Sequence, residues 1–169
     1  MHDWVVSTAT FKLVDKTHRE PIGTPEERKS RLDKFKAEFE NYFDLHYCLI
    51  YYVYSFVNLM IDQRTKNMFL TYWEDTKKWQ PWFYDNDTCF GLDNSGDLTY
   101  CYYNEDYAGE DEFGNLIPDS YKNFQVFKGD SVLWHNFRHC FSDEIKTTYF
   151  NLRSNGKITY DKYMERFIN

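Results

Sequence analysis

The chain has 169 residues, enough for one domain with a substantial core, and its aromatic content of 21% is too high for a disordered protein. Its net charge of −7 argues against a nucleic-acid-binding protein, which normally has a basic face. The four cysteines are widely spaced without a C-x-x-C pair, so neither a zinc site nor a disulfide framework is expected.

Neither a signal peptide nor a membrane span is expected. The N-terminal residues lack a basic stretch followed by an apolar core. The longest apolar stretch, residues 45–61, is interrupted by polar residues and contains four tyrosines. It is therefore predicted to be a buried helix rather than a membrane-spanning one.

Residues 1–23 are expected to form an extended or irregular N-terminal segment. A helix is predicted to follow, with Thr24 as its N-cap, Pro25 at its first position and Glu27 completing a capping box. Apolar residues then recur at helical spacing up to residue 43.

A second helix is predicted to begin after Asp44 and to continue to about Met60. This helix is apolar on nearly all sides, which indicates a central, buried position. The pattern then changes to two short strands, Met68–Trp73 and Trp79–Tyr84, which predict a β-hairpin. Pro81 in the second strand indicates an edge strand or a bulge.

The remaining chain is predicted to end in helices. In order, we expect a turn at 93–97, a strand at 98–103, an exposed acidic loop at 104–120, and helices at about 131–140, from Ser142 to Asn155-Gly156, and after Thr159.

Four polar residues between the buried helix and Gly91 form a candidate site. Asp62 stands five residues before Asn67, and the second strand of the hairpin leads into a D-x-D-x-x-x-G turn that contains Asp85 and Asp87. In a kinase-like site one carboxylate orients the nucleophile, while an amide and a second carboxylate hold the metal that bridges the phosphates.

Simpler roles for these residues remain open. Asp62 can cap a helix end or brace the loop at Arg64. The aspartates of this region can be ordinary turn carboxylates or a weak calcium site; they are Asp85, Asp87, Asp93 and Asp97. The EF-hand pattern fails, because Cys89 and Phe90 stand where it needs an acceptor and a glycine. Cys89 itself is predicted to be a small packed residue.

His135 and His139 are four residues apart and could share a metal. No H-E-x-x-H glutamate lies between them, so we expect surface or partly buried histidines on a helix.

The segment from Asn58 to Gly91 resembles the catalytic segment of the spore-coat (CotH-like) atypical kinases. The similar parts are, in order, Asp62, Lys66-Asn67-Met68-Phe69-Leu70, Thr76-Lys77-Lys78-Trp79, and Pro81 through Asp85-Asn86-Asp87 to Gly91. Tyr84 replaces the tryptophan that usually precedes the first aspartate. In this respect residues 83–96 are more similar to the version found in structural proteins of tailed phages.

The resemblance implies an α+β fold: a mostly helical, protein-kinase-like C-lobe with a β-hairpin, in a single domain at residues 24–169. It implies a catalytic role for Asp62 and metal binding by Asn67, Asp85 and Asp87, with Mg or Mn and ATP as cofactors if the site is active. Because no Gly-rich loop precedes Asp62, the N-lobe is expected to be absent, and catalysis by this chain alone is not expected.

Two functions follow from these expectations. We favour a structural or interaction component of a phage virion, located in the virion or the host cytoplasm, with other virion subunits as its partners. The alternative is a metal-dependent phosphotransferase lobe that is completed by another chain or by a missing N-lobe.

Overall fold

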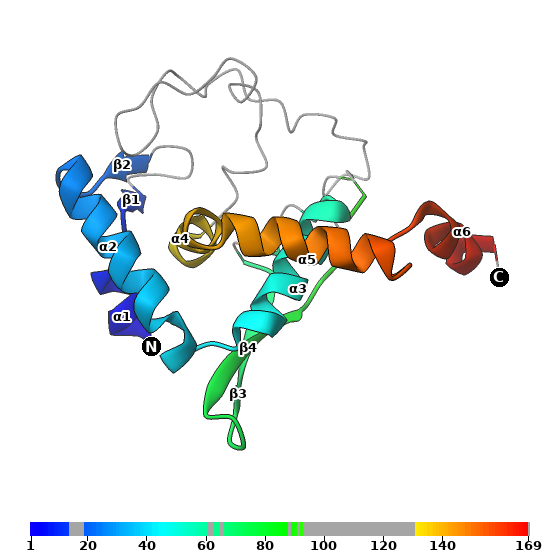
Figure 1. The fold of residues 1–169 in the computed structure, drawn as a ribbon, viewed down its shortest axis with the longest axis horizontal. Helices are drawn as coiled ribbons and strands as arrows, with labels where there is room; N and C mark the ends of the chain where they lie inside the picture. Colours follow the sequence, from blue (N-terminus) through cyan, green and yellow to red (C-terminus); the bar gives the residue numbers. More distant parts are fainter. Residues whose placement is uncertain are drawn as a thin grey trace, which may run out of the picture.

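Helices dominate the computed structural model of the chain, which describes residues 1–13, 19–60, 63–64, 66–87, 89–90, 92 and 131–168. Besides the helices, these residues form two separate, two-stranded antiparallel sheets (Figure 1). The predicted α+β class is therefore confirmed. The predicted turn, strand and acidic loop between residues 93 and 120 lie outside the described residues.

The elements occur in an order close to the predicted one. They are α1 (His2–Ser7), β1 (Phe11–Leu13), β2 (Arg19–Pro21), α2 (Pro25–Glu38), the 3-10 helix η1 (Phe39–Asn41), α3 (Leu45–Val57), β3 (Met68–Trp73), β4 (Lys78–Phe83), α4 (Val132–Cys140), α5 (Ser142–Ser154) and α6 (Tyr160–Ile168).

The capping box predicted at the start of α2 is present. The backbone N–H of Glu27 donates to the Thr24 hydroxyl at 3.3 Å, and the Thr24 N–H donates to the Glu27 carboxylate at 2.8 Å. Two of the orphan donors at the helix end are thereby satisfied.

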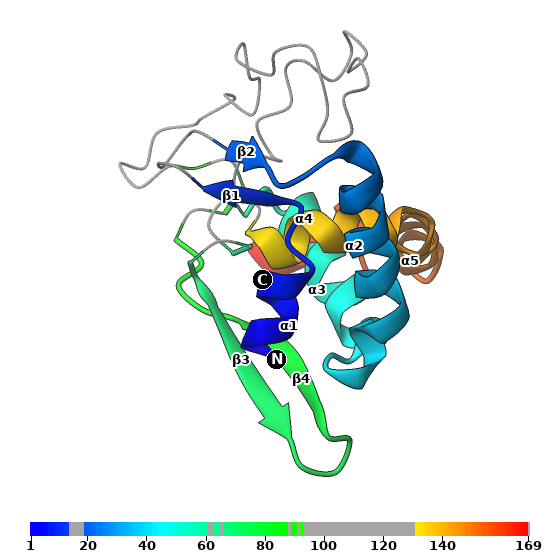
Figure 2. The same ribbon diagram turned by 90° about the vertical axis from the view of Figure 1, so that its left-hand side faces the viewer.

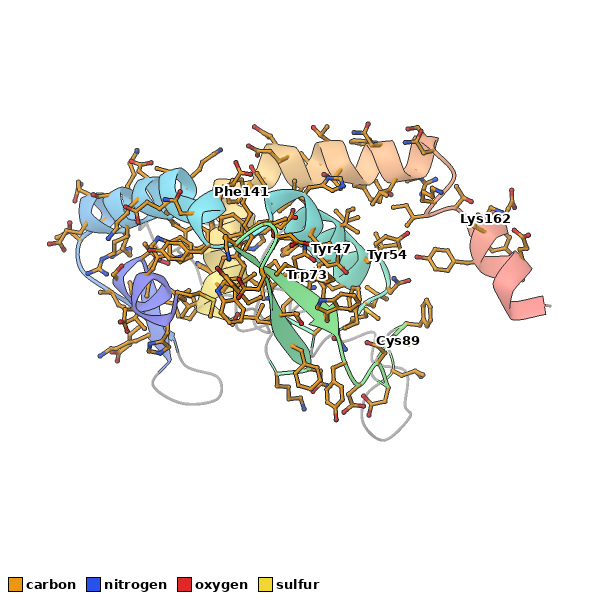
Figure 3. The ribbon with its side chains drawn as sticks, turned by 90° about the horizontal axis from the view of Figure 1, so that it is seen from below. Tyr47, Tyr54, Trp73, Cys89, Phe141 and Lys162 are labelled. Atoms are coloured by element: carbon orange, nitrogen blue, oxygen red, sulfur yellow. The ribbon has the colours of Figure 1, made fainter. Side chains whose placement is uncertain are left out.

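Helix α3 occupies the predicted central position. Its N-cap Asp44 accepts a hydrogen bond from the Tyr47 N–H at 3.0 Å. Tyr51, Tyr52 and Val53 of α3 are almost completely buried. Tyr51 and Tyr52 pack in an aromatic core whose other large members are Trp4, Phe35, Phe39, Phe43, Trp134, Phe137 and Phe141, the last of which is labelled in Figure 3.

The prediction for residues 1–23 is wrong at residues 2–7, which form α1 rather than an extended or irregular segment. This short helix has no side-chain cap, and it is held by packing instead. The ring of Trp4 stacks on Phe35 at 4.8 Å and on Tyr42 at 4.7 Å between ring centroids. Residues 11–13 and 19–21 are extended, as expected, and pair as β1 and β2.

Asn136 of α4 ties the N-terminal residues to the C-terminal helices. Its amide donates to the Thr8 carbonyl at 2.8 Å, and its side-chain oxygen accepts from the Thr10 hydroxyl at 3.0 Å. All three side chains are buried. Residues 8–10 are therefore packed against the C-terminal helices.

The hairpin of β3 and β4 projects from the helices (Figures 1 and 2). Its register pairs Met68 with Phe83 and Trp73 with Lys78 without a bulge, so Pro81 marks an edge strand. The free side of β4 is covered by the chain before α3, because the Trp79 N–H donates to the Tyr42 carbonyl at 2.7 Å.

The three predicted C-terminal helices are also present. Gly156 ends α5 with a φ of 67°, a left-handed conformation that glycine adopts without strain. The Thr159 hydroxyl accepts from the Lys162 N–H at 3.4 Å in the first turn of α6.

Candidate functional site

Two amide side chains hold the backbone of the turn that follows β4. The buried Gln63 amide donates to the carbonyls of Tyr84 and Asp85 at 3.1 and 3.0 Å. The Asn67 amide also donates to the Asp85 carbonyl, at 3.1 Å. The hairpin thus returns the predicted aspartate turn to the loop after α3.

The structure brings Asn67 and Asp85 together, but through the backbone carbonyl of Asp85 and not through its carboxylate. The side chains of Asp85 and Asp87 are exposed. Asp62, the predicted catalytic residue, lies outside the described residues, and its convergence with Asn67 and Asp87 stays a prediction. Within the described part of the chain, no three His, Cys, Asp or Glu side chains lie close enough together to hold a metal ion.

Gln63 is the central residue of this turn, and no pattern in the sequence marks it. Its partners lie 21 and 22 residues further along the chain, so no local spacing reveals them. Its own carbonyl accepts a hydrogen bond from the Tyr51 hydroxyl at 2.9 Å. Burial raises the pKa of Tyr51, so this hydroxyl remains a proton donor.

Arg64, directly after Gln63, anchors the same loop to the core. Its guanidinium donates to the Ser55 hydroxyl at 2.9 Å and lies 5.2 Å from the centre of the Tyr52 ring. Its carbonyl accepts from the Ser131 N–H at 3.0 Å. The candidate site therefore rests on α3 and on the start of α4.

The aspartate turn contains backbone conformations that L-residues rarely adopt. Asp85 has a φ of 54° and Phe90 a φ of 57°. Neither position is a helix end or a hairpin tip, where the positive φ angles of Leu59 and Lys77 occur. The Phe90 N–H donates to the carbonyl of Asn58 at 2.6 Å, which closes the turn onto the end of α3.

A second feature of the structure is an exposed group of aromatic side chains on the hairpin. We call it the aromatic hairpin face; it consists of Phe69, Trp73, Trp82 and Tyr84. Phe69 is 56% exposed, lies opposite Trp82 in the register, and contacts the Tyr84 ring at 4.5 Å between centroids. Trp73, labelled in Figure 3, is the last residue of β3.

The outer edge of β3 is open within the described part of the chain. No described residue outside the hairpin makes a backbone hydrogen bond to Met68–Trp73. The sequence of this strand, MFLTYW, contains neither a charged residue nor proline. Proteins commonly use both to protect edge strands from other chains.

The two histidines of α4 lie next to each other, with ring centroids 4.7 Å apart. His135 is buried, more deeply than expected, and packs edge-on against Phe11. His139 is half-buried, as predicted. Cys89 is a half-buried free cysteine.

No helix in the described ranges is both long and apolar enough to span a membrane. Comparison of the chain with protein-family models, curated proteins and solved structures found no match. The resemblance to the spore-coat kinases therefore stays a prediction that depends on the residues quoted for it.

Proposed function

We propose that this chain is a structural or interaction protein that binds an extended segment of a partner chain along β3. The observation that carries the proposal is the open edge of β3 beside the aromatic hairpin face. In a phage particle, the assembly that the sequence resemblance implies, the partner is another virion subunit. The chain has no catalytic activity by itself in this proposal.

Strand addition suits this edge because, among the described residues, only the β4 side of the hairpin is covered. The edge of β4 is occupied by Tyr42 and Asp44, which exchange backbone hydrogen bonds with Trp79. Of the two hairpin edges, β3 is therefore the one that the described part of the chain leaves to a partner strand. Backbone hydrogen bonds supply the affinity in such complexes, and alternate side chains supply the specificity.

The aromatic hairpin face provides the apolar contacts that a partner segment needs. Large aromatic side chains are enriched among the residues that contribute most binding energy at interfaces. Lys78 lies on the same face and is already 3.7 Å from the Glu40 carboxylate. The proposed partner segment is therefore uncharged, with apolar side chains on one face.

Synthetic ten-residue peptides of alternating valine and threonine, flanked by lysines for solubility, test the proposal. Titration into the isotope-labelled chain is expected to slow hydrogen exchange of the β3 amides. Thr71→Lys places a charge in the middle of the edge strand and is expected to weaken binding at least fivefold. Thr71 is exposed, so the fold should tolerate the change.

Thr76→Lys is the matched control, since it adds the same charge in the hairpin turn, outside the strand. Equal weakening by both variants, or protection that maps away from β3, would contradict the proposal. Sedimentation should show a monomer. If sedimentation instead shows a dimer, and Thr71→Lys dissociates it, the partner that binds β3 is a second copy of this chain.

One observation favours the alternative, a metal-dependent phosphotransferase lobe. Asp85 is held in a left-handed conformation by two amides, and strained backbone is often found at functional sites. In that alternative Asp85 and Asp87 would bind the metal from the exposed side of the turn. A transfer assay, described in the Discussion, distinguishes the two functions.

A further inference from the structure

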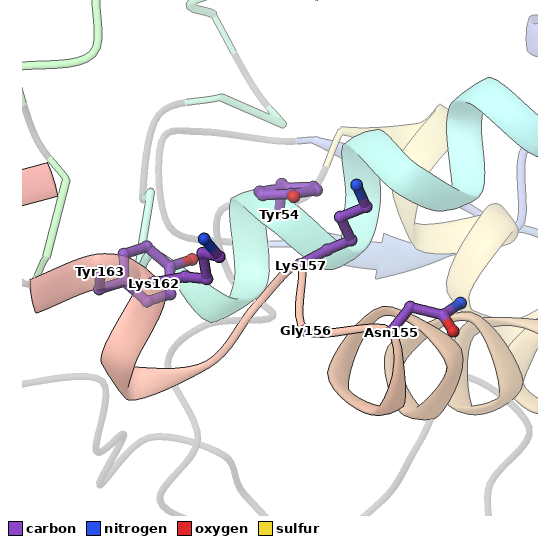
Figure 4. A pocket seen from close by; sticks show the side chains of 6 residues that line it. All are labelled: Tyr54, Asn155, Gly156, Lys157, Lys162 and Tyr163. Carbon is purple, nitrogen blue, oxygen red and sulfur yellow. The ribbon is translucent and has the colours of Figure 1, made fainter. Parts of the chain in front are cut away.

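A hollow of about 350 Å³ lies between the last turns of α3, the turn after α5, and α6. It is lined by Tyr54, Asn155, Gly156, Lys157, Lys162 and Tyr163. Figure 4 shows Lys162 and Tyr163 on one side, and Tyr54 and Lys157 across from them. The volume falls in the range typical of small-molecule sites.

The charges around this hollow favour an anion. Two of its six lining residues are lysines and none is acidic, although the chain carries a net charge of −7. Lys162 lies 2.7 Å from the Glu165 carboxylate. Lys157 makes no ion pair with any described residue, so its ammonium group is available to a ligand.

The two tyrosines give the hollow aromatic walls. Tyr163 is half-buried, and its ring meets Phe90 edge-on at 6.3 Å. Its hydroxyl is enclosed and lies beside the Asn58 side chain, whose hydrogen bond lowers the pKa of Tyr163 by less than burial raises it. Burial raises the pKa of Tyr163, so the hydroxyl stays protonated, and the ring rather than the hydroxyl is the part of Tyr163 that faces a ligand in this proposal.

Recognition must come from side chains rather than from the backbone of the turn. The N–H groups of Gly156 and Lys157 already donate to the carbonyls of Arg153 and Leu152, at 3.0 and 2.8 Å. A methyl group added at Gly156 would meet nothing within 4 Å, so the turn leaves room for a ligand.

We propose that this hollow binds a small aromatic anion, in which a phosphate or carboxylate group is attached to a planar ring. The ammonium group of Lys157 binds the anionic group as a point charge, and that of Lys162, which also pairs with Glu165, contributes a second, partly neutralised charge. The rings of Tyr54 and Tyr163 pack against the planar ring. The site is separate from β3, so its test does not depend on the proposed docking of a partner chain.

Phenyl phosphate is the probe, titrated into the isotope-labelled chain at low salt, where charge interactions are least screened. We expect a Kd on the order of 1 mM, with chemical-shift changes confined to the lining residues. Inorganic phosphate, which lacks the ring, and benzyl alcohol, which lacks the charge, should each bind at least threefold more weakly. Benzoate replaces the phosphate by a carboxylate and shows which anionic group is preferred.

Lys157→Gln is expected to weaken phenyl phosphate binding about fivefold, because one charged contact is lost. Lys146→Gln is the control: it removes the same charge from α5, where Lys146 pairs with Asp143 at 3.6 Å outside the hollow. Its effect should stay below about 1.5-fold. Equal weakening by both variants, shift changes elsewhere, or equal binding of inorganic phosphate would overturn the proposal.

Discussion

Gln63 is the residue on which the shape of the aspartate turn depends most. Gln63→Leu keeps a similar volume but removes the donor to the carbonyls of Tyr84 and Asp85. Buried acceptors that lose their donor are costly, so we expect a loss of about 2 kcal/mol in the free energy of unfolding. Urea unfolding of the variant measures it.

Asn67→Ala is the comparison for this prediction. Asn67 donates to the same Asp85 carbonyl, but its hydrogen bond is exposed to water. Loss of this bond should lower the free energy of unfolding by less than about 1 kcal/mol, because water replaces the donor. A Gln63→Leu variant no less stable than Asn67→Ala would show that Gln63 does not hold the turn.

The helices and the hairpin were largely predictable because their signals are local. For α2, the capping box lies within four consecutive residues, from Thr24 to Glu27. Thr24→Ala is expected to lower the free energy of unfolding by about 1 kcal/mol. Thr76→Ala, in the exposed hairpin turn, is the control and should change it by less than about 0.5 kcal/mol. If urea unfolding shows that Thr24→Ala lowers the free energy of unfolding no more than Thr76→Ala does, the cap contributes little to stability.

Helix α1 was not predictable, because its stability comes from contacts far along the chain. Six residues without a side-chain cap are too few for a stable isolated helix. Trp4 is instead fixed by Phe35 and Tyr42. The candidate site shows the same division: Asn67 and Asp85 were identified from spacing, whereas Gln63, with its distant backbone partners, was not.

The whole molecule should lose stability in alkaline solution, because burial raises the pKa of several acids in its core. The pKa of Cys140 is raised to about 12 by burial, and burial also raises those of Cys48 and Tyr51. Unfolded thiols lose their protons near pH 8.5. Above that pH the unfolded state binds fewer protons than the folded state, so the free energy of unfolding falls as pH rises toward 12.

The urea midpoint is therefore expected to fall between pH 8 and pH 10.5. Each group that is ionised only in the unfolded state contributes about 1.4 kcal/mol per pH unit. Cys140→Ala removes one such group, so its midpoint should depend less steeply on pH than that of the unaltered chain. A midpoint that stays constant over this range would contradict the assignment of these acids to the core.

The last expectation concerns catalysis by the chain as a whole. Phosphoryl transfer depends on groups that position the phosphates and the metal. In the described part of the chain the Asn67 amide is engaged by the Asp85 carbonyl, and no group of three potential ligands is assembled. Because the sequence contains no Gly-rich loop before Asp62 to cover the phosphates, we expect neither autophosphorylation nor ATP hydrolysis with Mg²⁺ or Mn²⁺.

Transfer of radiolabelled phosphate from ATP to the purified chain provides the measurement, with Asp87→Ala as the control. Asp87 is exposed, so this variant should fold normally and separate specific transfer from contamination. Weak binding of a divalent cation by Asp85 and Asp87 is compatible with an inactive chain, because carboxylates alone form loose sites for hard cations. Strong transfer that disappears in Asp87→Ala would instead make the chain a phosphotransferase and overturn the structural function proposed for it.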